Sequence, residues 1–94
     1  MKDSFNLNQK VIIVTGAAGL MGVQHCEAIL SHDGIPVLLD INLSRLKKLK
    51  LRLDKKFSSD VAIYVVDITS EIAVQECAEL VKKKFKTIDG LINN

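Results

Sequence analysis

The sequence predicts an α/β fold in which helices cover the faces of a parallel sheet. Short apolar runs rich in valine and isoleucine alternate with longer segments whose apolar residues recur at helical spacing. The first apolar run also ends in a cluster of glycines, from Gly16 to Gly22, where a strand would turn directly into a helix. Such alternation indicates parallel strands, because the connection between two of them has to cross the sheet, usually through a helix.

The composition restricts the class of protein. The 94 residues suffice for one small domain, and 48% of them are hydrophobic, as is ordinary for a compact soluble domain. A net charge of +2 is too small to favour nucleic acid or an anionic membrane as a partner. No apolar run reaches the roughly 18 residues of a membrane span, and the N-terminus has no signal-peptide pattern. Two cysteines are too few for a disulfide framework, so we expect a cytoplasmic protein.

The first half of the chain should contain two strands and one helix. Residues 10–15 are apolar on both faces, which predicts a central strand. Residues 20–31 should form a helix whose end is marked by Asp33-Gly34. Residues 36–40 follow as the second strand, with proline tolerated at its start. The apolar residues of the helix that keep helical spacing are Cys26, Ile29 and Leu30.

The second half repeats this order. Residues 43–57 should form the second helix, 61–66 the third strand and 89–94 the start of a fourth strand. Thr69 or Ser70 can cap a third helix between the last two strands. The expected apolar stripes are Leu46, Leu49, Leu53 and Phe57 on the second helix, and Ala73, Cys77, Leu80, Val81 and Phe85 on the third.

Right-handed crossovers then give the strand order 3-2-1-4, with a switch point between strands one and four. The first two helices should share one face of the sheet and the third should cover the other. This arrangement places Cys26 and Cys77 on opposite sides of the sheet, so we expect no disulfide between them.

The glycine cluster carries the strongest functional signal. It reads Thr15-Gly16-Ala17-Ala18-Gly19-Leu20-Met21-Gly22 and lies where a helix begins. Unpaired N–H groups and the helix dipole make such a start a site for a pyrophosphate. Gly16 would permit the turn, Gly19 would leave room for phosphates, and Gly22 would let helix and strand pack closely. The alternative is a plain strand-to-helix turn, which the surrounding βαβ pattern makes less favourable.

Asp40 ends the second strand, about 20 residues beyond the glycines. An acid at this place can accept hydrogen bonds from both hydroxyls of an adenosine ribose, and it would repel a 2′-phosphate. Ala17 and Ala18 supply no cation for such a phosphate, so the sequence favours NAD over NADP. The alternative role for Asp40 is a turn or capping residue before Asn42 or Ser44.

Asp67 and Ile68 follow the third strand, where the adenine ring would lie in this kind of fold. Asp67 could accept a hydrogen bond from the adenine amino group while Ile68 packs on the ring. Asp67 could also cap the helix that begins after Thr69, and the two roles are compatible. Together with the glycine turn, these residues predict the N-terminal half of a Rossmann-type doubly wound parallel sheet.

From Lys10 to Asn94 the chain resembles the short-chain dehydrogenase/reductase family. The glycine motif, the aspartate ending strand two, the Asp-Ile pair and the opening Asn93-Asn94 of an Asn-Asn-Ala-Gly motif appear in the family's order. The resemblance implies hydride transfer between NAD and a carbonyl or alcohol, with Asn94 beside the cofactor ribose. The residues expected at the cofactor are Gly16, Ala18, Gly19, Leu20, Met21, Gly22, Asp40, Ile41, Asp67, Ile68 and Asn94.

Leu20 departs from the family's smaller branch, which usually has glycine at this position. Glycines at 16, 19 and 22 resemble the extended branch of nucleotide-sugar epimerases and dehydratases, whereas residues 89–94 resemble the smaller branch, which we favour. The family's catalysis uses a serine and a Tyr-x-x-x-Lys pair. The single tyrosine, Tyr64, is followed four residues later by Ile68. We therefore expect the N-terminal part of an NAD-binding Rossmann domain over residues 1–94, without the second half of that domain and its catalytic segment, that catalyses nothing by itself.

Other features favour simpler interpretations. His25, Cys26 and His32 lack a further ligand for a metal, so we expect surface or interface histidines and no metal site. The seven cations between Arg45 and Lys56 suit a solvated helix face, although Arg45 could contact a 2′-phosphate. The fourth strand would have an unpaired edge, which suggests a homo-oligomer or, as an alternative function, a non-catalytic fragment that associates with itself.

Overall fold

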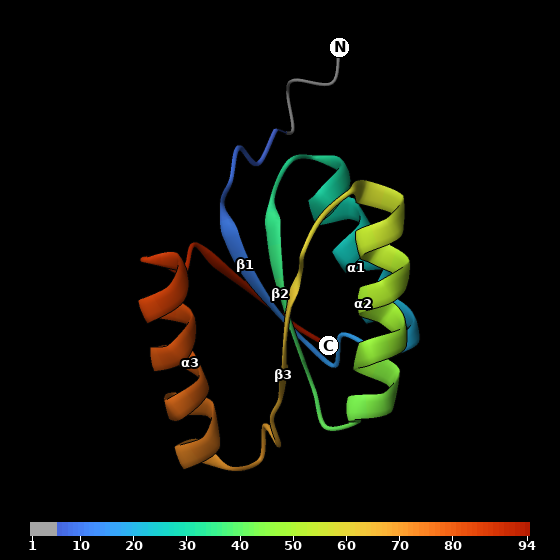
Figure 1. Ribbon diagram of the computed structural model, residues 1–94. Helices are drawn as coiled ribbons and strands as arrows, with labels where there is room; N and C mark the ends of the chain where they lie inside the picture. The colour runs from blue at the N-terminus through green and yellow to red at the C-terminus, as the bar shows by residue number, and fades with distance from the viewer. Residues whose placement is uncertain (1–5) are drawn as a thin grey trace.

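The computed structural model describes residues 6–94 and has the expected order of strands and helices (Figure 1). The two helices expected at residues 20–31 and 43–57 are confirmed, and the strand ends differ from expectation by one residue. The strands are β1 (Val11–Thr15), β2 (Ile35–Asp40), β3 (Ala62–Val65) and β4 (Gly90–Asn93). The helices are α1 (Leu20–Ser31), α2 (Leu43–Phe57) and α3 (Glu71–Phe85).

The four strands form one parallel sheet in the order β3-β2-β1-β4, which confirms the predicted topology. Val14 of β1 lies opposite Leu38 of β2 and Ile92 of β4, so β1 is bonded on both sides. α1 and α2 cover one face and α3 covers the other (Figure 1). This placement of the helices follows from right-handed crossover connections, which strands with a right-handed twist joined by right-handed helices favour.

The side chains of the central strands pack alternately into two separate hydrophobic cores, because successive side chains of a strand point to opposite faces. Val14 and Leu38 pack with Cys26 beneath α1 and α2. Ile13 and Val37 belong to the core that contains Cys77 beneath α3. Both cysteines are free and buried, and their separation by the sheet is confirmed.

Side-chain caps define the starts of two helices. The Asn42 Oδ1 accepts a hydrogen bond from the N–H of Arg45 at 3.0 Å, and Ser70, not Thr69, caps α3 by accepting from the N–H of Ala73 at 3.2 Å. The inclusion of Leu80 in the apolar stripe of α3 is wrong, since its side chain is 55% exposed. The buried face of α3 is centred on residues four apart, 77 and 81, and position 80 lies about 100° away from the latter.

A network of charged side chains holds the segment that connects α2 to β3 against the end of α2. The Lys50 Nζ contacts Asp54 Oδ2 at 2.8 Å and Asp60 Oδ1 at 2.6 Å, and it donates to the carbonyl oxygen of Val61. Hydrogen bonds to these two carboxylates raise the pKa of Lys50 above its ordinary 10.5. Asp54 Oδ1 also accepts from the N–H of Val61 at 2.9 Å. This network lies at the amino ends of the strands, far from the edge that carries the candidate site.

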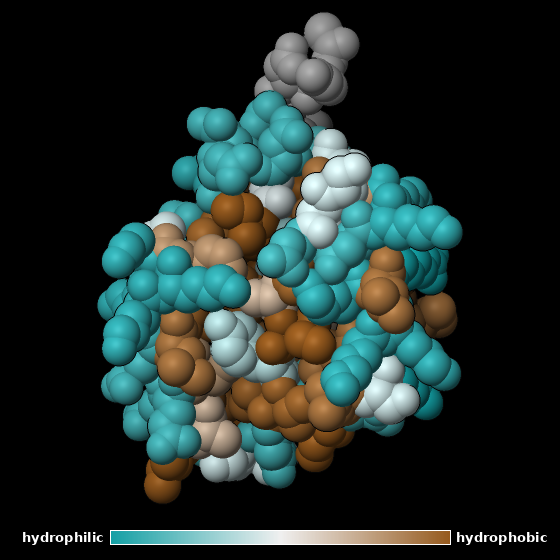
Figure 2. Space-filling view, viewed as in Figure 1, coloured by the Kyte–Doolittle hydropathy of each residue, from teal (hydrophilic) through white to brown (hydrophobic). Residues whose placement is uncertain are grey.

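The surface is polar on the outer faces of the helices and apolar in places along the sheet. In the view of Figure 2, apolar atoms gather at the centre, between the polar outer surfaces of α3 and α2. The two edge strands also carry exposed apolar side chains: Val65 of β3 is 52% exposed and Leu91 of β4 is 63% exposed. Within residues 6–94, no helix has both the length and the apolar character needed to span a membrane.

Candidate functional site

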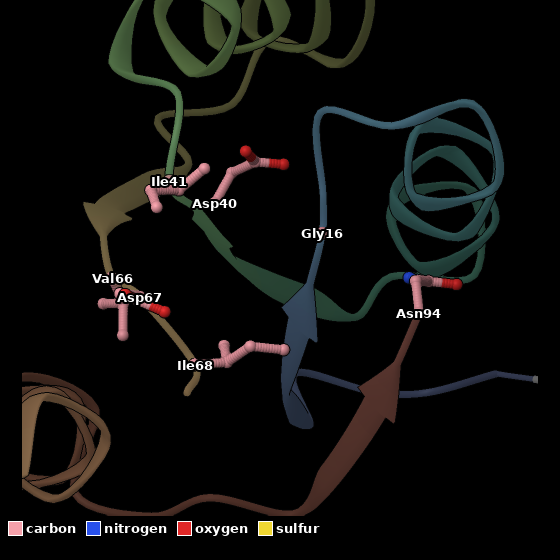
Figure 3. A pocket seen from close by; sticks show the side chains of 7 residues that line it. All are labelled: Gly16, Asp40, Ile41, Val66, Asp67, Ile68 and Asn94. Carbon is pink, nitrogen blue, oxygen red and sulfur yellow. The ribbon is translucent and has the colours of Figure 1, made fainter. Parts of the chain in front are cut away.

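The candidate site lies at the carboxyl ends of the strands, where the loops that follow β1, β2 and β3 meet the end of β4. An open pocket of about 210 Å³ occupies this edge of the sheet. Asp40 and Ile68 project from opposite sides of the pocket, and Gly16 and Asn94 form its other wall (Figure 3). Its lining residues are Gly16, Asp40, Ile41, Val66, Asp67, Ile68 and Asn94.

The glycine turn brings the start of α1 unusually close to the end of β1. Gly16 has a φ of +59°, a left-handed conformation that other residues adopt at a cost. A Cβ at Gly22 would lie 2.3 Å from the carbonyl oxygen of Gly16 and 2.7 Å from the Cα of Ala17. No side chain can therefore be accommodated at position 22 without moving the backbone. The expected close packing of helix and strand at Gly22 is confirmed.

The N-terminus of α1 presents backbone donors. Gly19 is the N-cap and has no side chain to accept a hydrogen bond from the first turn. Its own N–H donates to the carbonyl oxygen of Gly16 at 3.0 Å, so this donor is already used. The N–H groups of Leu20, Met21 and Gly22 have no acceptor within residues 6–94. Three free donors and the positive end of the helix dipole together make a cradle for an anion.

Asp40 joins the glycine turn to the start of α2. Its Oδ2 accepts from the N–H of Ala18 at 3.1 Å, and its Oδ1 accepts from the N–H of Asn42 at 3.0 Å. The structure thus shows the turn role that the sequence left open, and Asp40 also lines the pocket. An ionised carboxylate has about four acceptor sites, so two remain for a ligand's hydroxyl groups. The two roles considered for Asp40 can coexist.

Asp67 and Ile68 occupy the loop between β3 and α3. The Asp67 Oδ1 accepts from the hydroxyl of Thr69 at 2.6 Å and from its N–H at 3.0 Å. These two hydrogen bonds lower the pKa of Asp67, and its other oxygen stays available to a ligand. Ile68 is 48% exposed although it is apolar, and its side chain extends across the pocket toward β1 (Figure 3). The loop therefore offers a hydrogen-bond acceptor and an exposed apolar side chain next to each other.

Asn94 is anchored to β1 through Thr15. The Asn94 Nδ2 donates to the carbonyl oxygen of Thr15 at 3.0 Å, and the Asn94 N–H donates to the Thr15 Oγ1 at 3.2 Å. The Thr15 hydroxyl in turn donates to the Asn93 Oδ1 at 2.7 Å. Thr15 is only 6% exposed, so its hydroxyl is a buried link between the ends of β1 and β4. Nothing in the sequence alone indicated this linking role.

The structure brings together six of the eleven residues expected at the cofactor, which are the pocket residues Gly16, Asp40, Ile41, Asp67, Ile68 and Asn94. The other five, Ala18, Gly19, Leu20, Met21 and Gly22, lie in the turn and at the start of α1, outside the lining of this pocket. Val66 also lines the pocket and was missed. Its apolar character had assigned it to the third strand, but β3 ends one residue earlier.

The remaining titratable side chains bear on a metal site and on the tyrosine expected in the family's catalysis. Residues 6–94 contain no group of three or more His, Cys, Asp or Glu side chains placed to hold a metal ion. Tyr64 lies in β3, half-buried, and burial raises the pKa of its hydroxyl. The position four residues beyond it, Ile68, is apolar and provides no cation that could lower that pKa. Tyr64 is therefore not the tyrosine of a Tyr-x-x-x-Lys pair.

The glycine turn, the acid that ends β2 and the pocket at the carboxyl ends of the strands, where β1 and β4 meet at the switch point, form the arrangement typical of dinucleotide-binding sheets. The chain is 35% identical over 88 residues to post-translational flagellin modification protein A of Campylobacter coli, covering 94% of this chain and 34% of that protein. It is 33% identical over 90 residues to the mouse (Mus musculus) enzyme 15-hydroxyprostaglandin dehydrogenase [NAD(+)], covering 95% and 34%.

Among solved structures, NADPH-dependent 3-quinuclidinone reductase from Rhodotorula rubra matches with a TM-score of 0.86 and 29% identity, covering 96% of this chain and 34% of that one. The chain thus spans about a third of the length of these relatives. A family model described as short chain dehydrogenase matches residues 10–94. The chain belongs to the short-chain dehydrogenase family.

Proposed function

We propose that this chain is the NAD-binding portion of an oxidoreductase that transfers a hydride between NAD(H) and a carbonyl or alcohol. One observation carries the proposal: three N–H groups at the start of α1 that have no acceptor among residues 6–94 lie at the same edge of the sheet as the pocket lined by Asp40. The first feature suits a pyrophosphate and the second an adenosine. Bound NAD supplies the hydride acceptor, and the chain's own residues hold and orient it.

The proposed contacts follow the order of the strands. The N–H groups of Leu20 and Met21 would donate to the pyrophosphate, and Gly22 keeps them close to β1 because it has no Cβ. The free acceptor sites of Asp40 would receive the ribose hydroxyls, while Asp67 and Ile68 would contact the adenine. Asn94, fixed to β1 by two hydrogen bonds, would lie beside the second ribose.

A preference for NAD over NADP is part of the proposal. Two opposite unit charges about 4 Å apart interact by about 4 kcal/mol at an effective dielectric constant of 20, and like charges repel equally. A 2′-phosphate close to Asp40 would therefore be disfavoured by a few kcal/mol, reduced by solvent and salt at this open edge. The names of the relatives include both cofactors, NAD(+) and NADPH, so the preference rests on Asp40 itself.

No step of proton transfer is assigned to this chain. A hydride transfer to a carbonyl needs a group that donates a proton to the developing alkoxide. The residues that line the pocket include no hydroxyl, imidazole or amine side chain that could donate this proton. The proposed activity belongs to a longer polypeptide of the length of the relatives, and the 94 residues alone should show no turnover.

Self-association remains a separate proposal. The outer edge of β4 has no strand partner among residues 6–94, and two apolar hollows flank it. Ile88 and Leu91 line one hollow, on the α3 side, and Ile12 and Ile92 line the other, on the α1 side. We expect a dimer or larger assembly by light scattering, and a monomeric mass at high concentration would oppose this.

The dehydrogenases and reductases among the relatives do not favour the alternative of an extended-branch epimerase.

The test of the proposed function is a calorimetric titration of the 94-residue chain with NAD. The control variant is Asp40→Asn, which keeps an acceptor oxygen but removes the negative charge. We expect NAD to bind the parent chain, and NADP to gain affinity in Asp40→Asn relative to the parent. Absence of NAD binding by a folded chain would reject an assembled nucleotide site. Turnover of any alcohol by the purified chain would reject the assignment of catalysis to a longer polypeptide.

A further inference from the structure

The positive charge of the chain is concentrated on α2. This helix contains seven of the 13 lysines and arginines but only one of the 11 acidic residues, Asp54. The remainder of the chain therefore has six cations and ten acidic residues, so the small net charge of +2 conceals a strongly basic helix on an otherwise acidic chain. In the view of Figure 2, the surface over α2 is mainly hydrophilic, with a small apolar area among the hydrophilic side chains.

The buried residues of α2 show which side of the helix faces outward. Leu46, Leu49 and Leu53 are buried against the sheet. At about 100° per residue, position 51 lies on the opposite side of the helix, and three lysines surround it at spacings of three and four residues. We call the outward residues the basic face, and all of them are exposed: Ser44, Lys47, Lys48, Leu51 and Lys55.

The three lysines of the basic face have no counter-ion within the described chain. Glu27 of α1 contacts Arg52 at 3.2 Å and Lys56 at 3.5 Å, on the side of α2 that faces α1. No carboxylate among residues 6–94 lies within 4.0 Å of the charged groups of the lysines on the basic face. Internal ion pairs therefore do not offset the attraction of this face for an anionic partner.

Leu51, at the centre of the basic face, indicates the kind of anionic partner. Its side chain is 73% exposed, although a solvated helix face has no need of a leucine. An apolar centre surrounded by lysines suits the boundary of a lipid bilayer, because the leucine can enter the acyl region while the ammonium groups stay among the headgroups. The outer ridge of a helix is also convex, which suits a flat partner. The aromatic side chains on which the bases of a nucleic acid would stack are absent from this face.

We propose that the basic face binds the anionic surface of a membrane, with α2 lying along that surface. A cluster of lysines and arginines on an amphipathic helix is typical of proteins that bind phosphatidylserine-containing membranes. None of the residues of the basic face lines the nucleotide pocket, so a protein bound in this way keeps that pocket accessible. For the same reason the proposed nucleotide site and the membrane contact can be tested separately.

The experiment measures co-sedimentation of the 94-residue chain with lipid vesicles. We expect the chain to bind vesicles made of equal parts phosphatidylcholine and phosphatidylserine, to bind less as salt is added, and not to bind vesicles of phosphatidylcholine alone. The triple variant Lys47→Gln/Lys48→Gln/Lys55→Gln should bind the mixed vesicles about a hundredfold more weakly, which is about fivefold per lysine. Leu51→Gln should bind them about tenfold more weakly, because glutamine does not enter the acyl region.

The matched control is Lys82→Gln/Lys83→Gln/Lys84→Gln in α3, which removes the same charge from the opposite side of the sheet. We expect it to weaken binding by less than about threefold, because the attraction falls off within a Debye length. Circular dichroism checks that each variant is folded.

Four results would overturn the inference. They are failure of the folded chain to bind the mixed vesicles, an equal loss in the two triple variants, unchanged binding by Leu51→Gln, and binding to polyglutamate without binding to the vesicles. The last result would assign the basic face to an acidic protein instead.

Discussion

Replacement of Gly22 by alanine tests the closest contact in the proposed site. The new Cβ would lie 2.3 Å from the carbonyl oxygen of Gly16 and 2.7 Å from two atoms of Ala17. Ordinary van der Waals contact begins at 3.4 Å, so about 1.1 Å of separation is missing at the shortest contact. All three neighbours are backbone atoms, which cannot move aside as a flexible side chain could. The start of α1 would have to shift away from β1.

The cost follows from opposing effects. Overpacking costs about 1–3 kcal/mol, and contact with backbone on three atoms places this site near the upper limit. Alanine in a helix interior recovers about 1 kcal/mol relative to glycine. A net loss of about 2 kcal/mol is large for a domain of this size, whose unfolding free energy is about 5–14 kcal/mol. It corresponds to a fall in Tm of about 8–16 °C.

The assay is urea unfolding followed by circular dichroism, together with NAD titration. Gly90→Ala is the matched control, because its Cβ would lie 3.6 Å and 3.8 Å from carbons of Ile12, which is ordinary contact. We expect Gly90→Ala to leave stability within about 1 kcal/mol of the parent. Gly22→Ala should also weaken NAD binding at least about tenfold, since displaced N–H groups of α1 lose hydrogen bonds to the phosphates. Equal stability of the two variants would refute the reasoning.

Three further predictions concern buried and paired groups. Asp54→Ala should lower the free energy of unfolding in urea by about 1–3 kcal/mol, because the N–H of Val61 loses its acceptor. The control Asp60→Ala, at a side chain that is 94% exposed, should change it by less than about 0.5 kcal/mol. Similar losses in the two variants would show that Asp54 does not hold the connection between α2 and β3. Burial opposes ionisation of Asp54, but its hydrogen bonds, above all the one from Lys50, outweigh burial and hold the pKa of this carboxyl below 3.8. The contribution of Asp54 to stability should therefore be fully present above pH 3.8 and be lost as the pH falls through the pKa of the folded state. Unfolding of the parent and of Asp54→Ala at a series of acid pH values checks this. Burial raises the pKa of Cys26 to about 12 and also raises that of Cys77, so a thiol reagent such as DTNB should react with both only after unfolding, and fast labelling of the native chain would contradict their burial.

Local signals were sufficient to predict the helices and strands and six of the residues that line the pocket. The ranges of α1 and α2 follow from apolar spacing, because a helix that packs on a sheet must show one apolar stripe to it. Gly22 was correctly assigned to close packing, since a glycine one turn into a helix that opens a βαβ unit has few other reasons to be there. Leu80 was misassigned because periodicity alone cannot say how wide a stripe the sheet covers.

The hydrogen bonds between residues on different strands and loops could be identified only from the structure. The sequence allowed Asp40 to be either a turn residue or a cofactor-binding residue. The bonds to Ala18 and Asn42 show the turn role, and binding of a cofactor by the remaining acceptor sites stays a prediction. Thr15 looked like one more strand residue, but its hydroxyl joins β1 to the end of β4. Contacts between residues 78 or 79 positions apart leave no mark in local composition.

Local signals in the sequence were enough to predict the α/β class, the strand order and the position of the glycine turn, because these depend on periodicity, on the handedness of crossovers and on glycine's freedom from a Cβ. Which side chains share a wall of the pocket became clear only from the folded chain. There Asp40 lines the pocket and is bonded to the glycine turn on one side and to the start of α2 on the other. Charge pairing and pocket shape depend on distances between elements, which the order of residues along the chain does not specify.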